Sequence, residues 1–320
     1  MKLAFLFPGQ GAQAVGMGRA LADRHPAARE VFDAADRALG FSLSSICWDG
    51  PDARLRETRH AQPALLTHSV AALRLVEAAG IKPSWCAGHS LGEYSACVAA
   101  GALAFEDAVR LVHRRGELMY EAGLQTPGTM AAVLGLGRDD VAAACREAES
   151  AGIVVPANLN APGQIVISGE PAAVTLAGER CKTRGARRVI ALEVSGAFHS
   201  PLMASASTGL NERLRATPFA EPRCPIVPNV SAEPATTAAL VRHALEEQLL
   251  GAVRWEDSMR ALLAAGATGF VELGTGKVLR GLLRTLDKDA ASWNVEDPDS
   301  LDATLAGLQS AGPVSAERRI

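Results

Sequence analysis

Residues 88–96 read GHSLGEYSA, so that Ser90 stands between two glycines, each two positions away. A short apolar run at 84–87 precedes this stretch, and a segment compatible with a helix follows it at 91–100. The arrangement predicts a sharp turn from a strand to a helix, on which a serine has a strained backbone and an accessible hydroxyl. Ser90 is therefore a candidate nucleophile. The alternative is a serine that simply caps the following helix.

Apolar runs of strand length alternate with longer segments of helical period along the rest of the chain. This alternation is typical of βαβ units and predicts an α/β fold with a mainly parallel sheet. The expected strands are 3–7, 84–87, 226–227 and 270–273. The expected helices are 63–79, 91–100, 105–122, 201–216, one that ends near 250, 255–265 and one that starts at 277.

A second domain is expected in the middle of the chain, where the composition changes after Thr126-Pro127-Gly128. The expected strands there are 130–134, 153–157, 164–168 and 189–194, and the expected helices are 139–150 and 171–184. Their order, β-α-β-β-α-β, is that of a ferredoxin-like domain. We therefore predict a small ferredoxin-like α+β domain at 126–195, inserted into a large α/β domain formed by 1–125 and 196–320. Residues 311–320 are expected to form a loose tail.

The composition limits the classes of function. With 320 residues, 48% of them hydrophobic, the chain can form one large α/β domain that carries a smaller one. A formal net charge of -3 without a long basic run does not favour nucleic-acid binding. No stretch approaches the roughly 20 apolar residues of a membrane span. The six cysteines lack the spacing of a metal site or a disulfide framework, so a cytoplasmic protein is expected.

A serine nucleophile needs a base, and the chain has seven histidines. Five of them lie in segments that look like helices or charged loops: His25, His60, His68, His113 and His243. His89 adjoins the serine, so its side chain should leave the turn in another direction. His199 lies in a loop between a strand and a helix, where the chain should return to the large domain. The local pattern leaves a base and a structural histidine equally open for His199.

Two glycine-rich stretches imitate nucleotide-binding motifs. Residues 7–14, FPGQGAQA, fit G-x-G-x-x-A after a strand, but the acidic residues at the required distance, Asp33 and Asp36, lie in a segment that looks helical. Residues 274–277, GTGK, are followed by Val278 where a P-loop needs serine or threonine. Neither stretch is expected to bind a nucleotide in these ways.

Six motifs together resemble one family in order and spacing. They are FPGQGAQ at 7–13, GHSLGEYSA at 88–96, RRG at 114–116, NAPGQIVISG at 160–169, GAFHSPLM at 196–203 and GTGKVL at 274–279. The chain resembles the malonyl-CoA:acyl carrier protein transacylases, the acyltransferases of fatty-acid and polyketide synthesis, from about residue 3 to 285. The resemblance implies an α/β-hydrolase-like core, malonyl-CoA as substrate, an acyl carrier protein as partner, no cofactor or metal, and a monomer.

The same resemblance assigns catalytic roles. Ser90 would attack the malonyl thioester, and His199 would take its proton and later activate the thiol of the carrier in a ping-pong cycle. The main-chain carbonyl of Gln248 would orient the histidine, so Gln248→Ala is expected to be mild. The main-chain amides of Gln10 and Leu91 would form the oxyanion hole.

Substrate-binding roles also follow from the resemblance. Arg115 would bind the free carboxylate of the malonyl group, although its local sequence alone favours a surface charge on a helix. Phe198 would fill the space that an α-methyl group needs and so favour malonyl over methylmalonyl. His89 would contribute to substrate binding, and Asn160 would either shape the wall of the cleft or form a loop turn.

A basic surface for an acidic carrier is expected near the cleft. Lys277, Arg280, Arg284 and Lys288 follow one face of the helix expected from 277, which is equally consistent with an ordinary solvated face. Two rival functions remain, a thioester hydrolase of the same fold and a carrier-binding subunit without activity. The hydrolase would have little use for a buried Arg115, and the complete set of motif residues disfavours the inactive subunit.

Overall fold

A computed structural model describes residues 1–311, so the expected tail lies outside the described residues except for its first position. The larger sheet is parallel, with the strand order β7-β2-β1-β8-β9. Its strands are β1 (Leu3–Phe7), β2 (Trp85–Gly88), β7 (Ile226–Val227), β8 (Gly269–Leu273) and β9 (Ala291–Val295). All five residues of the central strand β1 are buried and apolar, as expected for a parallel strand covered on both faces.

The carboxyl ends of β1 and β2 lie side by side, because the register pairs Phe7 with Gly88. The loop after β1 and the turn after β2 therefore meet at one edge of the sheet, which is where open α/β sheets bind their ligands. The two glycine-containing motifs that the sequence singled out, at 7–13 and 88–96, are brought together in this way.

Helices cover the parallel sheet. The first part of the chain forms α1 (Arg19–Arg24), α2 (Pro26–Leu39), α3 (Leu43–Asp49), α4 (Asp52–Arg56), α5 (Thr58–Ala78), α6 (Gly92–Ala99) and α7 (Phe105–Gln125). The last part forms η2 (Pro201–Met203), α10 (Ala204–Ala216), α11 (Ala238–Gln248), α12 (Trp255–Ala264), α13 (Val278–Leu286) and α14 (Pro298–Ser310). No helix within residues 1–311 is long and apolar enough to cross a membrane.

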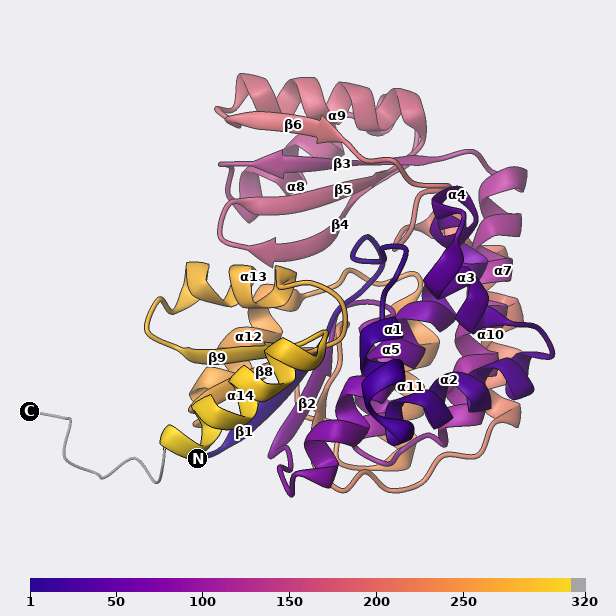
Figure 1. The fold of residues 1–320 in the computed structure, drawn as a ribbon. Helices are drawn as coiled ribbons and strands as arrows, with labels where there is room; N and C mark the ends of the chain where they lie inside the picture. Colours follow the sequence, from indigo (N-terminus) through magenta and orange to yellow (C-terminus); the bar gives the residue numbers. More distant parts are fainter. Residues whose placement is uncertain (312–320) are drawn as a thin grey trace, which may run out of the picture.

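The smaller sheet is antiparallel, with the order β4-β5-β3-β6. It consists of β3 (Thr129–Leu134), β4 (Val154–Ala161), β5 (Gln164–Gly169) and β6 (Arg188–Ala191), together with α8 (Arg138–Glu147), η1 (Glu149–Ala151) and α9 (Pro171–Thr183). These elements bury an apolar cluster of their own. Figure 1 shows this sheet above α13 and the parallel sheet. The structure is thus a mixed α/β fold with one parallel and one separate antiparallel sheet.

Backbone hydrogen bonds tie the antiparallel sheet to the main part of the chain. Val253 donates to the carbonyl of Ala157 on β4 at 2.8 Å, and its own carbonyl accepts from Leu159 at 2.8 Å. Arg138 at the start of α8 adds an ion pair with Asp257 on α12 at 2.8 Å. The two sheets are therefore held together by directional contacts, which fix the space between them.

Helix α5 begins at Thr58, five residues earlier than the sequence indicated, and continues through Pro63. Proline has no N–H to donate to the carbonyl four residues before it. The ring of His113 on α7 replaces that donor, with its Nδ1 2.9 Å from the Arg59 carbonyl. His113 is thus a structural histidine, and a contact that is distant in sequence explains why the helix tolerates its proline.

Other elements are missing from the sequence-based expectation. The helices α1, α3 and α4 have five to seven residues, which is too few for a helical period to be recognised. Strand β9 and helix α14 were also missed, although α14 carries a clear start signal. Asp297 caps it by accepting from the Ser300 amide at 2.8 Å, and Pro298 occupies its first position.

The turn between β2 and α6 is packed too closely for any residue but glycine at positions 88 and 92, two residues before and after Ser90. A Cβ atom on Gly88 would lie 1.9 Å from the carbonyl carbon of Gly92, and a Cβ on Gly92 would lie 2.0 Å from the carbonyl oxygen of Phe7. Ser90 itself has a φ of 50°, in the left-handed region. The G-x-S-x-G pattern is therefore required by backbone packing, which the helix-cap alternative does not explain.

We expect Gly92→Ala to destabilise the protein strongly, because β1 or α6 must move to admit the methyl group, and overpacking typically costs about 1–3 kcal/mol or more. Gly281→Ala on α13 is the matched control. A Cβ atom there meets no heavy atom within 4 Å, so alanine should be neutral or stabilising by up to about 1 kcal/mol. Thermal unfolding measures both variants, and equal melting temperatures would contradict the packing argument.

Candidate active site

Ser90 and His199 form a direct contact. The Ser90 hydroxyl lies 2.7 Å from Nε2 of His199, although the two residues are 109 positions apart. His199 follows β6 and has a φ of 57°, and both residues belong to the three non-glycine residues of 1–311 with positive φ. Strained backbone of this kind persists only where the surroundings impose it, and it is common at functional sites. The geometry is that of a nucleophile and its general base.

The other ring nitrogen of His199 determines the tautomer. Nδ1 lies 3.0 Å from the main-chain oxygen of Gln248 and 3.2 Å from that of Gly251. Carbonyl oxygens only accept hydrogen bonds, so Nδ1 carries the proton and Nε2 directs its lone pair at the Ser90 hydroxyl. Burial, and then the nearby Arg115, lower the pKa of His199 to about 3, which keeps the ring neutral with a free lone pair on Nε2.

The expected oxyanion hole lies beside the serine. Gln10 and Leu91 line the same cleft as Ser90. Within residues 1–311, neither of their main-chain N–H groups donates to a protein acceptor. The loop after β1 comes close enough to the turn that a Cβ on Gly9 would lie 2.6 Å from the His89 carbonyl oxygen. Two free N–H groups next to a nucleophile are suited to a developing oxyanion.

Arg115 is buried at the centre of the site, with 1% of its surface exposed. Its guanidinium donates to the side chain of Gln62 at 2.8 Å, to that of Gln248 at 3.0 Å and to the Ser90 hydroxyl at 3.2 Å. In the described part of the chain no carboxylate lies within ion-pair distance of it. The alternative of a surface charge therefore fails for Arg115 and instead describes its neighbour Arg114, which pairs with glutamates on the surface.

Asn229 was not anticipated from the sequence, yet it holds the turn in place. Its side-chain oxygen accepts from the Ser90 amide at 2.6 Å, and its side-chain nitrogen donates to the Gly88 carbonyl at 2.7 Å. Its own main-chain amide donates to the Glu93 carboxylate at 3.0 Å. The only sequence signal was its position shortly after an expected strand, a type of position that often carries site residues.

The structure contradicts the expectation that the side chain of Gln248 is unimportant. Besides offering its carbonyl to His199, Gln248 donates from its amide nitrogen to the Ser90 carbonyl and to the Glu93 carboxylate, both at 2.9 Å. Its amide oxygen accepts from Arg115. The residue is 1% exposed and is not among the residues that line the cleft. Its side chain therefore connects the nucleophile, the cation and a buried carboxylate.

Three further predicted site residues lie in the site. His89, Asn160 and Phe198 line a cleft of about 490 Å³ together with Ser90 and Arg115. His89 Nε2 lies 2.8 Å from the side-chain oxygen of Asn160 on β4, so these two residues join opposite sides of the cleft. Phe198 is 7% exposed and contributes an apolar wall.

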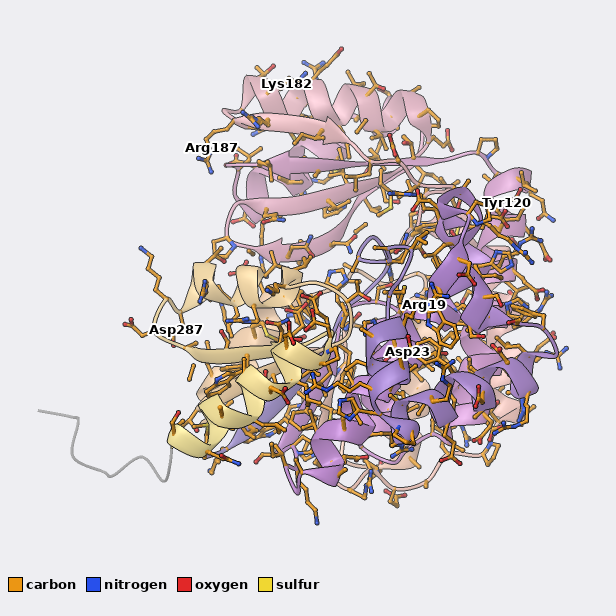
Figure 2. All side chains as sticks on the ribbon, in the orientation of Figure 1. Arg19, Asp23, Tyr120, Lys182, Arg187 and Asp287 are labelled. Atoms are coloured by element: carbon orange, nitrogen blue, oxygen red, sulfur yellow. The ribbon has the colours of Figure 1, made fainter. Side chains whose placement is uncertain are left out.

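The expectation of four basic residues on one helix face is wrong. Lys277 precedes α13 and Lys288 follows it, near Asp287, which Figure 2 labels at the exposed end of this helix. Arg280 is half-buried, and its guanidinium binds the side chain of Asn294 at 2.6 Å. Lys277 and Arg284 are exposed. Lys288 is exposed as well, so three of the four basic residues remain accessible.

We expect Gln248→Ala to be harmful rather than mild, because it removes one hydrogen bond from each of three buried polar groups, the Ser90 carbonyl, the Glu93 carboxylate and the Arg115 guanidinium. Hydrogen bonds to charged groups contribute about 1.5–3 kcal/mol each. The free energy of unfolding should fall, and labelling of Ser90 by a fluorophosphonate should slow about tenfold or more. Glu247→Ala, an exposed change one position earlier on α11, is the control and should resemble the wild type. Equal unfolding curves and labelling rates for the two variants would refute this role.

Burial raises the pKa of the Glu93 carboxyl from 4.5 to about 7, despite hydrogen bonds from Gln248 and Asn229 and the charge of Arg115. Between these values the unfolded chain is ionised while the folded chain keeps the proton, so stability falls as pH rises. The difference corresponds to about 3 kcal/mol. We expect the stability of the wild type relative to Glu93→Gln to drop by up to this amount between pH 4.5 and 8. Urea unfolding tests it, and a constant difference would contradict it.

Comparison with known proteins agrees with this geometry. Residues 4–309 match the acyl transferase domain family. The malonyl CoA-acyl carrier protein transacylase of Bacillus subtilis is 47% identical over 96% of this chain and 98% of its own length. The corresponding crystal structure from Clostridium perfringens has a TM-score of 0.94 at 37% identity, covering 97% of this chain and 98% of that one.

A further solved structure shows a type II polyketide synthase acyl carrier protein in complex with its malonyl-transacylase. It has a TM-score of 0.92 at 40% identity, covering 96% of this chain and 99% of that one. Family match, sequence identity and fold agree over nearly the whole length. The chain therefore belongs to the malonyl-CoA:acyl carrier protein transacylase family of acyl transferase domains.

Proposed function

We propose that this protein transfers a malonyl group from malonyl-CoA to the phosphopantetheine thiol of an acyl carrier protein through an ester on Ser90. One observation carries the proposal. The Ser90 hydroxyl lies between a neutral histidine at 2.7 Å and a buried guanidinium at 3.2 Å that has no acidic partner among residues 1–311. A nucleophile next to an uncompensated cation suits an acyl group that carries its own carboxylate.

In the first half-reaction, the Ser90 oxygen attacks the thioester carbonyl while His199 Nε2 takes the hydroxyl proton. The carbonyl oxygen gains negative charge and is stabilised by the amides of Gln10 and Leu91. The carbon–sulfur bond then breaks, and the leaving CoA thiolate receives the proton from His199. Malonyl remains bound to Ser90 as an ester.

In the second half-reaction, the carrier's thiol gives its proton to His199 and attacks the ester carbonyl. The same oxyanion donors act again, the bond to the Ser90 oxygen breaks, and that oxygen recovers the proton. The carbonyls of Gln248 and Gly251 stabilise the positively charged imidazole that exists between the two proton transfers. No step requires a metal or a cofactor.

The malonyl carboxylate is expected to bind Arg115. A buried cation without an acid partner is unfavourable, and an incoming carboxylate both neutralises it and matches its planar donor fork. Phe198, directly before the base, places an apolar ring in the wall of the cleft, which supports malonyl over methylmalonyl. Arg115 also disfavours the hydrolase alternative, because a hydrolase that clears misloaded carriers gains nothing from this cation.

The proposal extends to the partner and to the architecture. Exposed Lys277 and Arg284 support docking of an acidic carrier, as does the relative solved with its acyl carrier protein. The strand order β4-β5-β3-β6 supports a ferredoxin-like domain at 126–195, inserted into an α/β-hydrolase-like domain of 1–125 and 196–320. Ser90, His199 and Arg115 meet within one chain, so the proposed reaction does not require a second copy, and we propose a monomer. The six unpaired thiols support a cytoplasmic location.

Intact-mass spectrometry tests the function. The protein is mixed with malonyl-CoA, acetyl-CoA or methylmalonyl-CoA, and a carrier bearing phosphopantetheine is then added. We expect one malonyl group on the wild type, none on Ser90→Ala, and transfer to the carrier on addition. Arg115→Met should slow malonyl loading by at least about tenfold, since charge-assisted hydrogen bonds contribute about 1.5–3 kcal/mol, while acetyl loading changes less.

Arg114→Met is the matched control, since it removes the adjacent arginine from the surface, and it should load malonyl like the wild type. Loss of the acyl group to water before any carrier is added would favour a hydrolase. No acylation of Ser90 would favour an inactive carrier-binding subunit.

A further inference from the structure

We propose that Glu93 is a positioning residue of this site. One oxygen of its carboxylate fixes the serine turn and also the arrangement of His199 and Arg115. The inference rests on the proposed function and adds to it. Glu93 lies in the first turn of α6, three residues after the nucleophile, and is 1% exposed. No step of the proposed reaction uses it.

The first connection runs from Glu93 to the serine turn. Its Oε2 atom accepts from the main-chain amide of Asn229 at 3.0 Å. The side chain of Asn229 in turn bridges the Gly88 carbonyl and the Ser90 amide, on the two sides of the strained turn. The Glu93 carboxylate thus positions Asn229, which in turn positions Ser90. A shift of Asn229 would release the left-handed backbone at Ser90.

The second connection runs from the same oxygen to Gln248, whose amide nitrogen donates to it at 2.9 Å. This contact decides how the amide of Gln248 is oriented. A carboxylate can only accept and a guanidinium can only donate, so the nitrogen must face Glu93 and the oxygen must face Arg115. Glu93 therefore acts on Arg115 through an intervening amide instead of a direct ion pair.

Gln248 also positions the base, because its main-chain carbonyl accepts a hydrogen bond from His199 Nδ1 at 3.0 Å. Gln248 lies at the end of α11, and its side-chain contacts anchor that end against the turn. The charged and titratable groups near Glu93 are Arg115, Tyr94 and Cys97, and Arg115 is the one cation among them. Loss of the carboxylate would thus disturb nucleophile, base and cation together.

Two substitutions of similar size separate the hydrogen bonds from the rest of the side chain. Glu93→Gln keeps an oxygen that can accept from both Asn229 and Gln248, whereas Glu93→Met keeps the volume and removes the acceptor. Asp36→Leu is a control for lost stability, since Asp36 accepts three hydrogen bonds from Ser42 and Ser44 and does not line the cleft. All are assayed at pH 8, with the thermal midpoint measured for each.

Labelling by a fluorophosphonate, in which the Ser90 oxygen displaces fluoride, counts active molecules and gives a rate for each. Loading from malonyl-CoA gives kcat and KM. We expect Glu93→Met to show a labelling rate per active molecule about tenfold lower and a KM about tenfold higher. Glu93→Gln should stay within about threefold of the wild type in both. Asp36→Leu should lose thermal stability but keep its rate per active molecule and its KM.

A Glu93→Met protein with fewer active molecules, but with wild-type rate and KM for each, would overturn the proposal and leave a purely structural glutamate. If this variant does not fold, Glu93→Asp replaces it, because it keeps the charge and withdraws the oxygen by one methylene. Wild-type kinetics in Glu93→Asp would equally overturn the proposal. Failure of the wild type to accept malonyl would instead refute the proposed function, whatever the variants show.

Discussion

The buried guanidinium of Arg115 is the charge to which the surrounding polar groups are fitted. Taking a cation out of water is unfavourable unless hydrogen bonds and opposite charge compensate it. Gln62, Gln248 and the Ser90 hydroxyl supply hydrogen bonds, but Glu93 makes no direct ion pair with Arg115 and is connected to it by the amide of Gln248. Compensation is therefore incomplete in the free protein, which favours binding of a carboxylate next to the nucleophile.

Backbone strain is concentrated in the same place. Ser90 and His199 both adopt left-handed backbone angles. The side chain of Asn229 accepts from the Ser90 amide, and the main-chain carbonyl of Gln248 accepts from the His199 ring. Gly88 and Gly92 allow α6 to lie against β1, so the turn cannot relax by moving the helix away. The strained backbone at Ser90 and His199 lowers the stability of the folded protein, but it holds the two reacting groups in a fixed geometry.

Much of the fold was predictable because local periodicity and composition determine it. The parallel strands, the long helices and the β-α-β-β-α-β order follow from apolar patterns of strand and helix length. Ser90 was identified by its turn, but the local sequence of Arg115 favours a surface charge, and only the resemblance placed it in the site. Asn229 and the side-chain role of Gln248 were not predictable, since their partners lie 136 and 155 residues away and the contacts exist only in the folded chain.

The two proposed half-reactions impose a further constraint. His199 must accept a proton from a serine in one and from a thiol in the other, so its tautomer has to be the same for both, and two main-chain carbonyls ensure this. In both half-reactions the malonyl carbonyl carbon becomes tetrahedral while it is bonded to the Ser90 oxygen. The buried part of the site can therefore be complementary to that shared intermediate alone. Discrimination between CoA and the carrier must then arise outside the groups that perform the chemistry, on the accessible surface around the cleft.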